Sequence, residues 1–319
     1  MPLNYKLPTN GNMPNVSMPN KKEEVQKKDI SFEAQNPKYA IEDVVLNESI
    51  LSEIQNIFSF NKYKNLLMDT WGMSKVYPER KGLLVNLYGE SGTGKTMTAH
   101  AIAHELGKQI VVVNYAEIES KYVGETSKNL VLLFREAEEQ DAVLLFDEAD
   151  ALLSKRVTSM MTSNDVSVNQ TKSVLLNILN DYKGVAIFTT NFISNFDFAF
   201  MRRIPFQIRF DLPDEQQRME IWKHYLLCGL PYQGNIEFIA KNYKNISGSD
   251  IANCVWLAAL DTAAKGKQYV SQDCLIYMLE KIIRAKKDYA MKSSDAVKVT
   301  VNEVDEKYAL EQLKKGENS

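Results

Sequence analysis

The sequence predicts an α/β protein in which a doubly wound parallel sheet is followed by a small, all-helical lid domain. Short apolar segments alternate with amphipathic helical patterns between residues 83 and 210, which is typical of a parallel sheet covered on both faces. A glycine-rich segment, residues 89–96, joins the first apolar segment to the first helical one. After Pro213 the pattern is helical throughout. The 319 residues, 45% hydrophobic and 25% charged, suffice for two such units.

Five apolar segments are predicted to be strands, and the stretches between them to contain helices. The strands are assigned to residues 83–88, 110–114, 142–146, 185–190 and 206–210, and the helices to about 95–106, 127–139 and 169–181. Residues 143–146 are apolar at every position, as expected of a strand buried on both faces. In such a sheet, ligands bind at the carboxyl ends of the strands.

Shifts in pattern divide the chain into four segments. These are a disordered arm at residues 1–37, a large α/β domain at 38–212, a lid domain at 213–314 and a tail at 315–319. The large domain is expected to open with a helix capped by Asn47 or Ser49, and the lid with a capping box from Asp214 to Gln217. Further lid helices are predicted at about 235–244, 249–264, 271–289 and 302–314.

Charge, cysteine spacing and the length of apolar runs argue against a nucleic-acid-binding protein, a cysteine metal site and a membrane span. The net charge is −3, the pI is about 5.8, and the longest basic stretch is interrupted by two glutamates, which argues against nucleic acid as the main partner. Cys228, Cys254 and Cys274 lack metal-site spacing and are expected to lie buried in helices. No signal-peptide core or membrane-length apolar run is present, so a cytoplasmic protein is expected.

The glycine-rich segment predicts a phosphate-binding loop of the P-loop NTPase type. It has the spacing G-x-x-x-x-G-K-T between a strand and a helix, where backbone N–H groups and the helix dipole surround phosphate oxygens. Lys95 is expected to reach the β- and γ-phosphates, and the Thr96 hydroxyl to hold Mg²⁺. The flanking strand and helix disfavour an ordinary glycine turn. The residues expected to bind the nucleotide here are Gly89, Glu90, Ser91, Gly92, Thr93, Gly94, Lys95, Thr96 and Met97.

Polar residues follow the third and fourth predicted strands. Asp147 is placed to hold Mg²⁺, directly or through water. Glu148 is the candidate for the group that polarises the attacking water. An acidic pair that only caps the next segment is the alternative, which the neighbouring phosphate loop disfavours. Asn191 could hold the water or a γ-phosphate oxygen, although asparagine after a strand is also a common turn former.

Arg202 and Arg203 stand next to each other among apolar residues. The residues alone leave two interpretations open. The pair could be solvated surface arginines, or it could supply fingers that neutralise the charge developing on a transferred phosphoryl group.

Together these motifs resemble the AAA family of ATPases, within the AAA+ superfamily, over about residues 38–314. The matching segments are Walker A (89–96), Walker B (143–148), the first sensor (Asn191), the arginine pair, Ser-Gly-Ser-Asp-Ile at 247–251 and Tyr-Val-Gly-Glu at 122–125. The resemblance implies Mg²⁺-dependent ATP hydrolysis in a homo-oligomeric ring, usually a hexamer. Arg202 and Arg203 would then act on the nucleotide of the neighbouring subunit.

The resemblance also implies how the base is held. In the family, the backbone near Asp43 and Val44 and the lid turn containing Gly248 and Ser249 enclose the adenine. His224 lies close to a position where relatives contact the nucleotide but does not match it clearly, so no role is assigned to it.

Two departures from the family pattern bear on the site. Glu90 and Ser91 replace two prolines that the family usually carries, which should alter the stiffness of the loop more than its chemistry. Residues 204–206, Ile-Pro-Phe, replace a more polar stretch after the arginines. That change makes Arg203 the firmer candidate for a finger.

The resemblance gives Lys121, Tyr122 and Val123 a place facing a central pore. In remodelling members of the family, an aromatic residue at this position grips an extended polypeptide, and its neighbours shape the grip. Without the resemblance, Tyr122 would be expected to pack on the start of its own helix. Residues 157–168 are polar and predicted to be flexible, so they are a candidate second pore loop.

Three functions compete. The first is an ATP-driven ring motor that remodels, unfolds or disassembles proteins through a central pore. The second is a nucleic-acid-linked AAA+ switch of the loader or initiator type, and the third is an ATP-gated assembly or signalling ring. The second class usually carries a lid arginine and lacks an aromatic pore loop, whereas this chain has Ser249, Asp250 and Tyr122. The presence of Glu148 and the arginines disfavours the third, so a protein-remodelling ATPase is the prediction.

Overall fold

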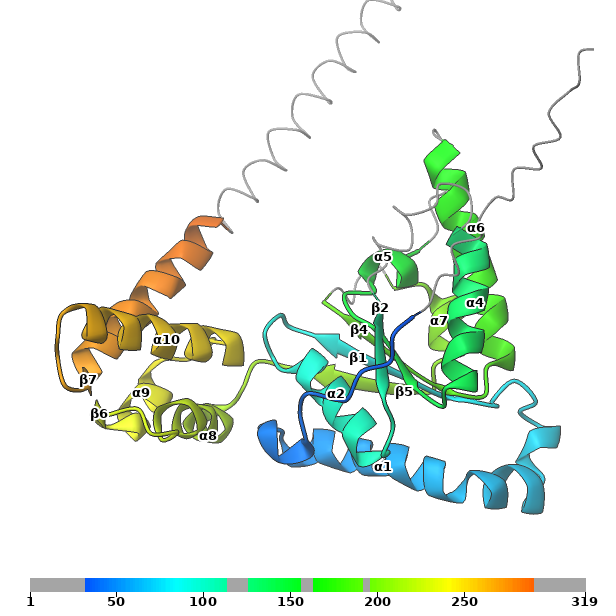
Figure 1. Ribbon diagram of the computed structural model, residues 1–319, viewed down its shortest axis with the longest axis horizontal. Coiled ribbons are helices and arrows are strands. Elements are labelled where there is room, and N and C mark those ends of the chain that lie inside the picture. The colour runs from blue at the N-terminus through cyan, green and yellow to red at the C-terminus, as the bar shows by residue number, and fades with distance from the viewer. Residues whose placement is uncertain (1–31, 114–125, 156–162, 192–195, 290–319) are drawn as a thin grey trace, which may run out of the picture. The chain divides into compact units, whose positions relative to one another are not determined.

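The structure is a computed structural model that describes residues 32–113, 126–155, 163–191 and 196–289, without the side chains of residues 163–167. Its centre is a sheet of five parallel strands in the order β2-β3-β4-β1-β5 (Figure 1). The strands are β1 (Leu83–Gly89), β2 (Ile110–Val113), β3 (Val143–Phe146), β4 (Val185–Thr190) and β5 (Phe206–Phe210). All five predicted strands are confirmed, to within one residue at their ends.

The order of the strands brings three loops together. β1 lies between β4 and β5, and β4 pairs with β3 on its other side, all in parallel. Every residue of β3 and β4 is buried, which explains why these strands are continuous apolar runs. Parallel strands end at the same edge, so the segments after β1, β3 and β4 meet there.

The helices of the α/β region are short to medium in length. They are α1 (Glu48–Asn65), α2 (Lys95–Glu105), α4 (Thr126–Glu139), α5 (Asp150–Leu153), α6 (Ser163–Asp181) and α7 (Phe198–Met201), with single turns at Ile41–Asp43, Leu66–Thr70 and Met73–Lys75. Asn47 caps α1, because its side chain accepts a hydrogen bond from the Ile50 N–H at 2.8 Å.

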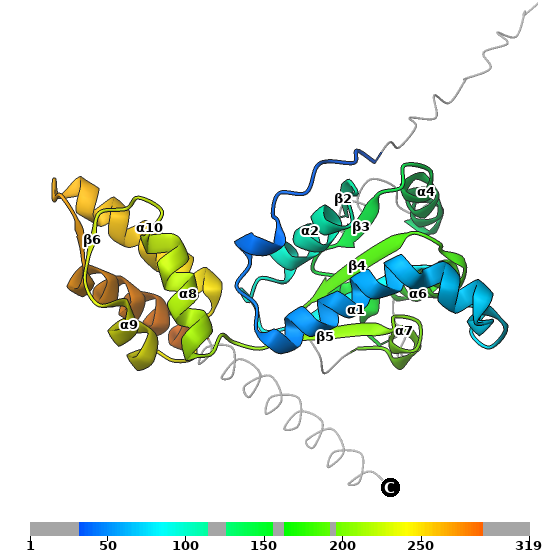
Figure 2. The ribbon, with the colours of Figure 1, turned by 90° about the horizontal axis from the view of Figure 1, so that it is seen from below.

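Helices cover both faces of the sheet, as Figures 1 and 2 show, which confirms the doubly wound α/β fold. On one face, α1 and α2 bury residues such as Ile54 and Ile102 against the sheet. On the other face, α4 and α6 bury residues such as Leu133 and Leu175. Neighbouring strand residues alternate between the two cores, with Leu84 in one and Val85 in the other. This two-faced burial fixes the register of the strand ends that carry the site.

Two boundaries differ from the sequence predictions. Residues 32–37 were predicted to belong to the disordered arm, but Gln35 forms an antiparallel bridge with Ile110 through hydrogen bonds of 2.8 and 2.9 Å. This single bridge covers part of the edge strand β2 and is too short to leave a periodic pattern in the sequence. Helix α6 begins at Ser163, six residues before its predicted start, so residues 163–168 of the candidate second pore loop are helical.

The described part of the C-terminal region is mainly helical, as predicted, and has its own core, while the predicted helix at 302–314 lies outside the described residues. Its helices are α8 (Glu215–Leu226), α9 (Ile236–Asn242), α10 (Gly248–Ala264) and helical residues 272–289. Asp214 and Gln217 form the predicted capping box. Trp222 is fully buried among apolar side chains from all four helices. Two strands of two residues each, β6 (Tyr232–Gln233) and β7 (Val270–Ser271), pair in parallel, which corrects the prediction of a purely helical region. Among the described residues, no helix has the length and apolar character required to span a bilayer.

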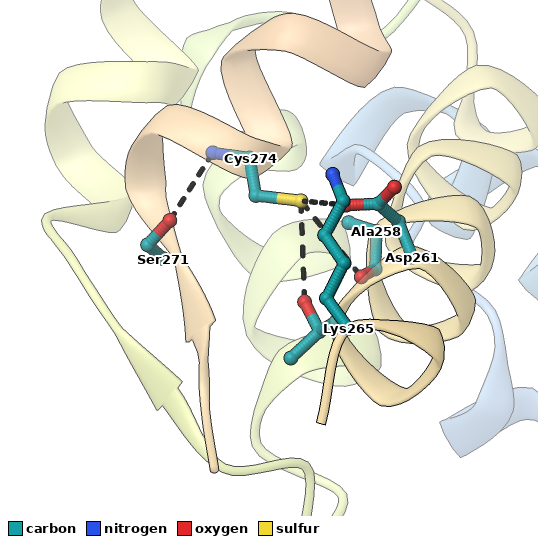
Figure 3. Close-up of polar contacts among 6 residues, drawn as sticks. Ala258, Asp261, Lys265, Ser271 and Cys274 are labelled. Carbon is teal, nitrogen blue, oxygen red and sulfur yellow. Dashed lines mark hydrogen bonds and ion pairs between the residues drawn. The ribbon is translucent and has the colours of Figure 1, made fainter. Parts of the chain in front are cut away.

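The three cysteines lie in different environments. Cys254 is buried in α10, as predicted, and burial raises the pKa of its thiol to about 12. Cys274 is partly buried, and its Sγ lies 3.7 Å from the carboxylate of Asp261 and 3.8 Å from the Ala258 carbonyl oxygen (Figure 3). Cys228 is exposed and lies after the end of α8, so the prediction of a buried helical cysteine is wrong there.

Candidate nucleotide-binding site

The phosphate loop joins β1 to α2 in a tight turn whose glycines have backbone angles that other residues rarely adopt. Gly89 has a φ of 133°, and a Cβ atom there would lie 2.0 Å from the carbonyl oxygen of Phe210 on β5. Gly94 caps α2 with a φ of 97°. Both angles are rare for residues with side chains. The turn leads directly into the N-terminus of α2, where unpaired N–H groups and the helix dipole favour an anion.

Lys95 is the first residue of α2, and only 7% of it is exposed. Its Nζ donates hydrogen bonds to the carbonyl oxygens of Gly89 at 2.9 Å and Glu90 at 2.7 Å. Burial lowers the pKa of Lys95, and nearby carboxylates, Asp150 first among them, oppose that shift. The two carbonyl partners are neutral, so the ammonium retains charge with which to pair an anionic ligand.

Asp147 is held at the end of β3 by two hydroxyl groups. The Thr96 hydroxyl donates to its Oδ1 at 2.8 Å, and the Thr189 hydroxyl at the end of β4 donates to the same oxygen at 2.6 Å. The Glu148 N–H in turn donates to the Thr189 hydroxyl oxygen at 3.0 Å. A hydroxyl and a carboxylate oxygen at contact distance beside a phosphate loop are ligands of the kind that Mg²⁺ takes together with phosphates. The residues present therefore fit this cation.

Glu148 has an unusual backbone conformation. Its φ of 52° lies in the left-handed region, where a residue other than glycine costs about 1 kcal/mol. Its side chain is exposed and belongs to the wall of the cavity described next. The carboxylate is therefore accessible to water, while the backbone is fixed by Thr189. Asn191 is fixed in a similar way, because its N–H donates to Asp150 Oδ1 at 3.0 Å.

A cavity of about 340 Å³ lies beside the loop and is lined from several parts of the chain. Gly248 and Ser249, at the start of α10, form part of its wall, and the Ser249 N–H donates to the Gly92 carbonyl oxygen at 3.1 Å. The predicted residues that line it are Asp43, Val44, Ser91, Gly92, Thr93, Gly94, Lys95, Thr96, Met97, Asp147, Glu148, Asn191, Gly248 and Ser249. Gly89 and Glu90, also predicted to bind the nucleotide, are not among the lining residues, and their carbonyl oxygens accept the hydrogen bonds from Lys95.

Comparison with known proteins identifies the family. Residues 85–212 match the family model described as "ATPase family associated with various cellular activities (AAA)". The chain is also 30% identical over 256 residues to a putative 26S proteasome regulatory subunit homolog of Methanocaldococcus jannaschii, covering 79% of this chain and 69% of that protein. The chain belongs to the AAA family of ATPases. The family and the fold predicted from the motifs are thereby confirmed.

Other similar proteins are longer than the region they share with this AAA ATPase. A 26S proteasome regulatory subunit 8 homolog of Schizosaccharomyces pombe is 30% identical over 74% of this chain and 59% of its own length. The ATP-dependent zinc metalloprotease FtsH of Lachnoclostridium phytofermentans is 34% identical over 58% of this chain and 33% of its own length. The chain thus spans between a third and about two thirds of these relatives.

One wall of the cavity of this AAA ATPase contains residues to which the sequence analysis assigned no role. His224 and Tyr225 of α8 line it, with their rings in edge contact at a centroid distance of 5.0 Å. Burial raises the pKa of Tyr225. The family resemblance placed His224 close to a nucleotide contact without matching it clearly, and the apolar and aromatic pattern of α8 predicts a core without showing which residues face a ligand. The other lining residues that were not predicted are Val45, Thr189, Ile221 and Ala252.

The two arginines lie apart from the nucleotide cavity of their own chain. Arg202 is exposed, and Arg203 is partly buried, and both line a second cavity together with Lys81, Asn180 and other residues. The Arg203 Nε donates to Asn180 Oδ1 at 2.7 Å, and a second guanidinium nitrogen donates to the Ala199 carbonyl oxygen at 2.9 Å. Of the pair, Arg203 therefore has the defined orientation. The pore candidates Lys121, Tyr122 and Val123 fall outside the described residues, as do residues 157–162.

Proposed function

We propose that this AAA ATPase binds ATP with Mg²⁺ in the 340 Å³ cavity and uses its hydrolysis to remodel proteins. The observation that carries the proposal is the contact of Thr96 with Asp147 at the mouth of the phosphate loop, with Glu148 as the next residue. It joins a cation site, a phosphate site and an accessible carboxylate in one place. ATP and water would be converted to ADP and inorganic phosphate.

Each side chain has a proposed role in that reaction. Lys95 and the N-terminus of α2 would neutralise phosphate charge, and Thr96 and Asp147 would hold Mg²⁺, which supplies further neutralisation when bound. The carboxylate of Glu148 would accept a proton from the attacking water as the bond to the γ-phosphorus forms. Asn191 would orient that water through its amide. The bond between the γ-phosphorus and the bridging oxygen breaks, and the β-phosphate keeps the electron pair.

We further propose that the working form is a homo-oligomeric ring, hexameric as in the family resemblance. Within one chain, Arg203 lines a cavity different from the one that contains Glu148. A second copy could bring Arg202 and Arg203 to the open side of the nucleotide cavity, whose described lining residues include no arginine. In this arrangement residues 38–212 form the large domain and residues 213–314 the lid.

Protein remodelling is proposed from the relatives. Two of them are named as 26S proteasome regulatory subunits or homologs, and a third as an ATP-dependent metalloprotease. In the proposed ring, Tyr122 with Lys121 and Val123 would contact an extended polypeptide in a central pore. Nucleotide binding alone would not require such an aromatic residue.

The test measures ATP hydrolysis with and without casein, an unstructured protein that serves as a general probe. Lys95→Ala should abolish hydrolysis in both conditions. Tyr122→Ala should keep the basal rate and lose stimulation by casein, whereas Tyr122→Phe should retain it. Equal stimulation of the wild type and Tyr122→Ala would remove the pore assignment. Full ATPase activity of Lys95→Ala would contradict the assignment of the nucleotide site.

A further inference from the structure

An ion pair joins the last described helix to the start of α10. The Nζ of Lys286 lies 2.6 Å from Oδ2 of Asp250. The Asp250 side chain is 7% exposed and that of Lys286 is 57% exposed. The lysine thus reaches from the surface to a nearly buried carboxylate. A carboxylate that is buried to this degree needs a charged or hydrogen-bonding partner to remain ionised at low cost.

Asp250 is also the residue that fixes the N-terminus of α10. Its Oδ2 accepts hydrogen bonds from the N–H and the hydroxyl of Ser247, both at 2.8 Å. The Asp250 N–H donates back to the Ser247 hydroxyl oxygen at 3.3 Å, which completes a reciprocal cap. Oδ2 therefore serves the cap and the ion pair at once, so the position of Lys286 is coupled to the first turn of α10.

The first turn of α10 is in direct contact with the phosphate loop. Beyond the Ser249 hydrogen bond to Gly92, a Cβ atom on Gly92 would lie 2.8 Å from the hydroxyl oxygens of both Ser247 and Ser249. Gly248 and Ser249 also line the nucleotide cavity. A shift of the cap would therefore move the Ser249 donor of this hydrogen bond, and the serines lie so close to Gly92 that a side chain would not fit between them and the loop.

We propose that Lys286 is a positioning residue for nucleotide binding, acting through the Asp250 cap on the start of α10 and the phosphate loop. The inference rests on the proposed function and adds a residue 36 positions beyond the cap to it. Two effects act in the same direction. The ion pair holds the cap in place beside Gly92, and the ammonium neutralises a carboxylate that lies next in sequence to Ser249, a residue of the cavity wall.

The test compares Lys286→Met with Lys287→Met, since Lys287 is an exposed lysine on the same helix and its loss removes the same net charge. The dissociation constant of a fluorescent ATP analogue and the steady-state KM and kcat for ATP are measured at low and high salt. Lys286→Met should raise the dissociation constant and KM about three- to tenfold, the range for a half-exposed ion pair backed by hydrogen bonds, with kcat changed less than twofold. Lys287→Met should leave both constants unchanged. Lys286→Arg should restore most of the affinity.

Several results would overturn the inference. Wild-type affinity of Lys286→Met, or equal losses in Lys286→Met and Lys287→Met, would show that the pair does not act on the site. If Lys286→Met lowers the thermal midpoint markedly, Lys286→Gln is measured as well, because it keeps a hydrogen-bond donor without the charge. Its dissociation constant should lie between those of the wild type and Lys286→Met. Lys95→Ala separates the two hypotheses. If that variant loses nucleotide while Lys286→Met does not, the positioning role fails alone; if it binds normally, the proposed site fails.

Discussion

Asn180 accepts a hydrogen bond from Arg203 at 2.7 Å and fixes the direction of its guanidinium group. The bond uses Nε, and a bond to the Ala199 carbonyl oxygen uses a second nitrogen of the group. Arg203 lines a cavity together with Lys81 and Arg202. Because Nε and Nη1 are both held, the plane of the guanidinium is fixed, and Nη2 can donate to an anion with little further loss of conformational freedom. Asn180 therefore pre-orients the stronger of the two finger candidates.

Replacing Asn180 with Ala should lower kcat for ATP hydrolysis about tenfold, because the finger loses its orientation while its charge remains. Arg203→Ala should cost more, and the double variant should be no worse than Arg203→Ala alone. Asp181→Asn is the control. Asp181 lies in the same cavity wall and forms an ion pair of 2.5 Å with Lys81, so this variant changes the wall without touching Arg203. Additive losses in the double variant would mean that Asn180 acts independently of Arg203.

Thr189 and Thr190 provide a matched pair at the end of β4. Thr189 bonds Asp147 and the Glu148 N–H, whereas the buried Thr190 hydroxyl has no hydrogen-bond partner in the part of the chain that the structure describes. Thr189→Val should weaken Mg²⁺ binding about tenfold, the low end of the range for a residue that orients a metal ligand. Thr190→Val should be neutral or slightly stabilising. The measurement is the Mg²⁺ concentration at half-maximal ATPase rate, and equal values for the two variants would rule out this role of Thr189.

Glu148→Gln separates nucleotide binding from hydrolysis. The amide keeps the size of the side chain but cannot accept the proton from water, so hydrolysis should fall about 100-fold or more while ATP binding stays near the wild-type value. Equilibrium binding of a fluorescent ATP analogue and release of phosphate are measured on the same preparation. Asp197→Asn, at the cap of α7, is a control carboxylate outside the cavity. A wild-type rate of hydrolysis in Glu148→Gln would show that Glu148 is not the group that accepts the proton from the attacking water.

The strands and the phosphate loop could be predicted from sequence because local patterns determine them. Residues 143–146 are buried on both faces of the sheet, so every position is apolar and the strand stands out. Lys95 and Thr96 follow glycines whose backbone angles few other residues adopt, so the motif itself indicates the conformation of the loop. Asp147 and Glu148 could be placed near the loop since parallel strands end at one edge.

The missed features depend on contacts between distant segments. His224 lines the cavity from α8; the resemblance placed it near a nucleotide contact without a clear match, and no local signal distinguishes a helix residue that faces a ligand from one that faces solvent. Gln35 joins the edge of β2 through one bridge, which leaves no period in the sequence. Lys286 meets Asp250 across 36 residues, and a helix with several lysines does not reveal which of them is paired. Tertiary packing, and not the local structural propensity of these residues, determines the three contacts.

His100 should make the stability of the protein depend on pH near neutrality. The ring is 4% exposed in α2, its Nδ1 accepts a hydrogen bond from the Lys38 N–H at 3.3 Å, and it makes an edge contact with Tyr39. Burial lowers the pKa of His100 below its usual 6.5, the charge of Lys38 lowers it further, and Asp147 partly offsets both. Protonation would also replace the acceptor at Nδ1 with a donor that faces another N–H.

The sign of the effect follows from proton uptake. As pH falls through 6.5, histidine in the unfolded chain takes up a proton while His100 in the folded chain stays neutral, so the unfolding free energy decreases until the pH passes the lowered pKa. Above 6.5 the stabilisation is fully present. His100→Asn keeps an acceptor without a titrating group, so it should flatten the stability profile between pH 7.5 and 5.5. Urea unfolding at both pH values measures this, with His104→Asn on the exposed side of the same helix as the control. An unchanged slope in His100→Asn would assign the acid sensitivity to other groups.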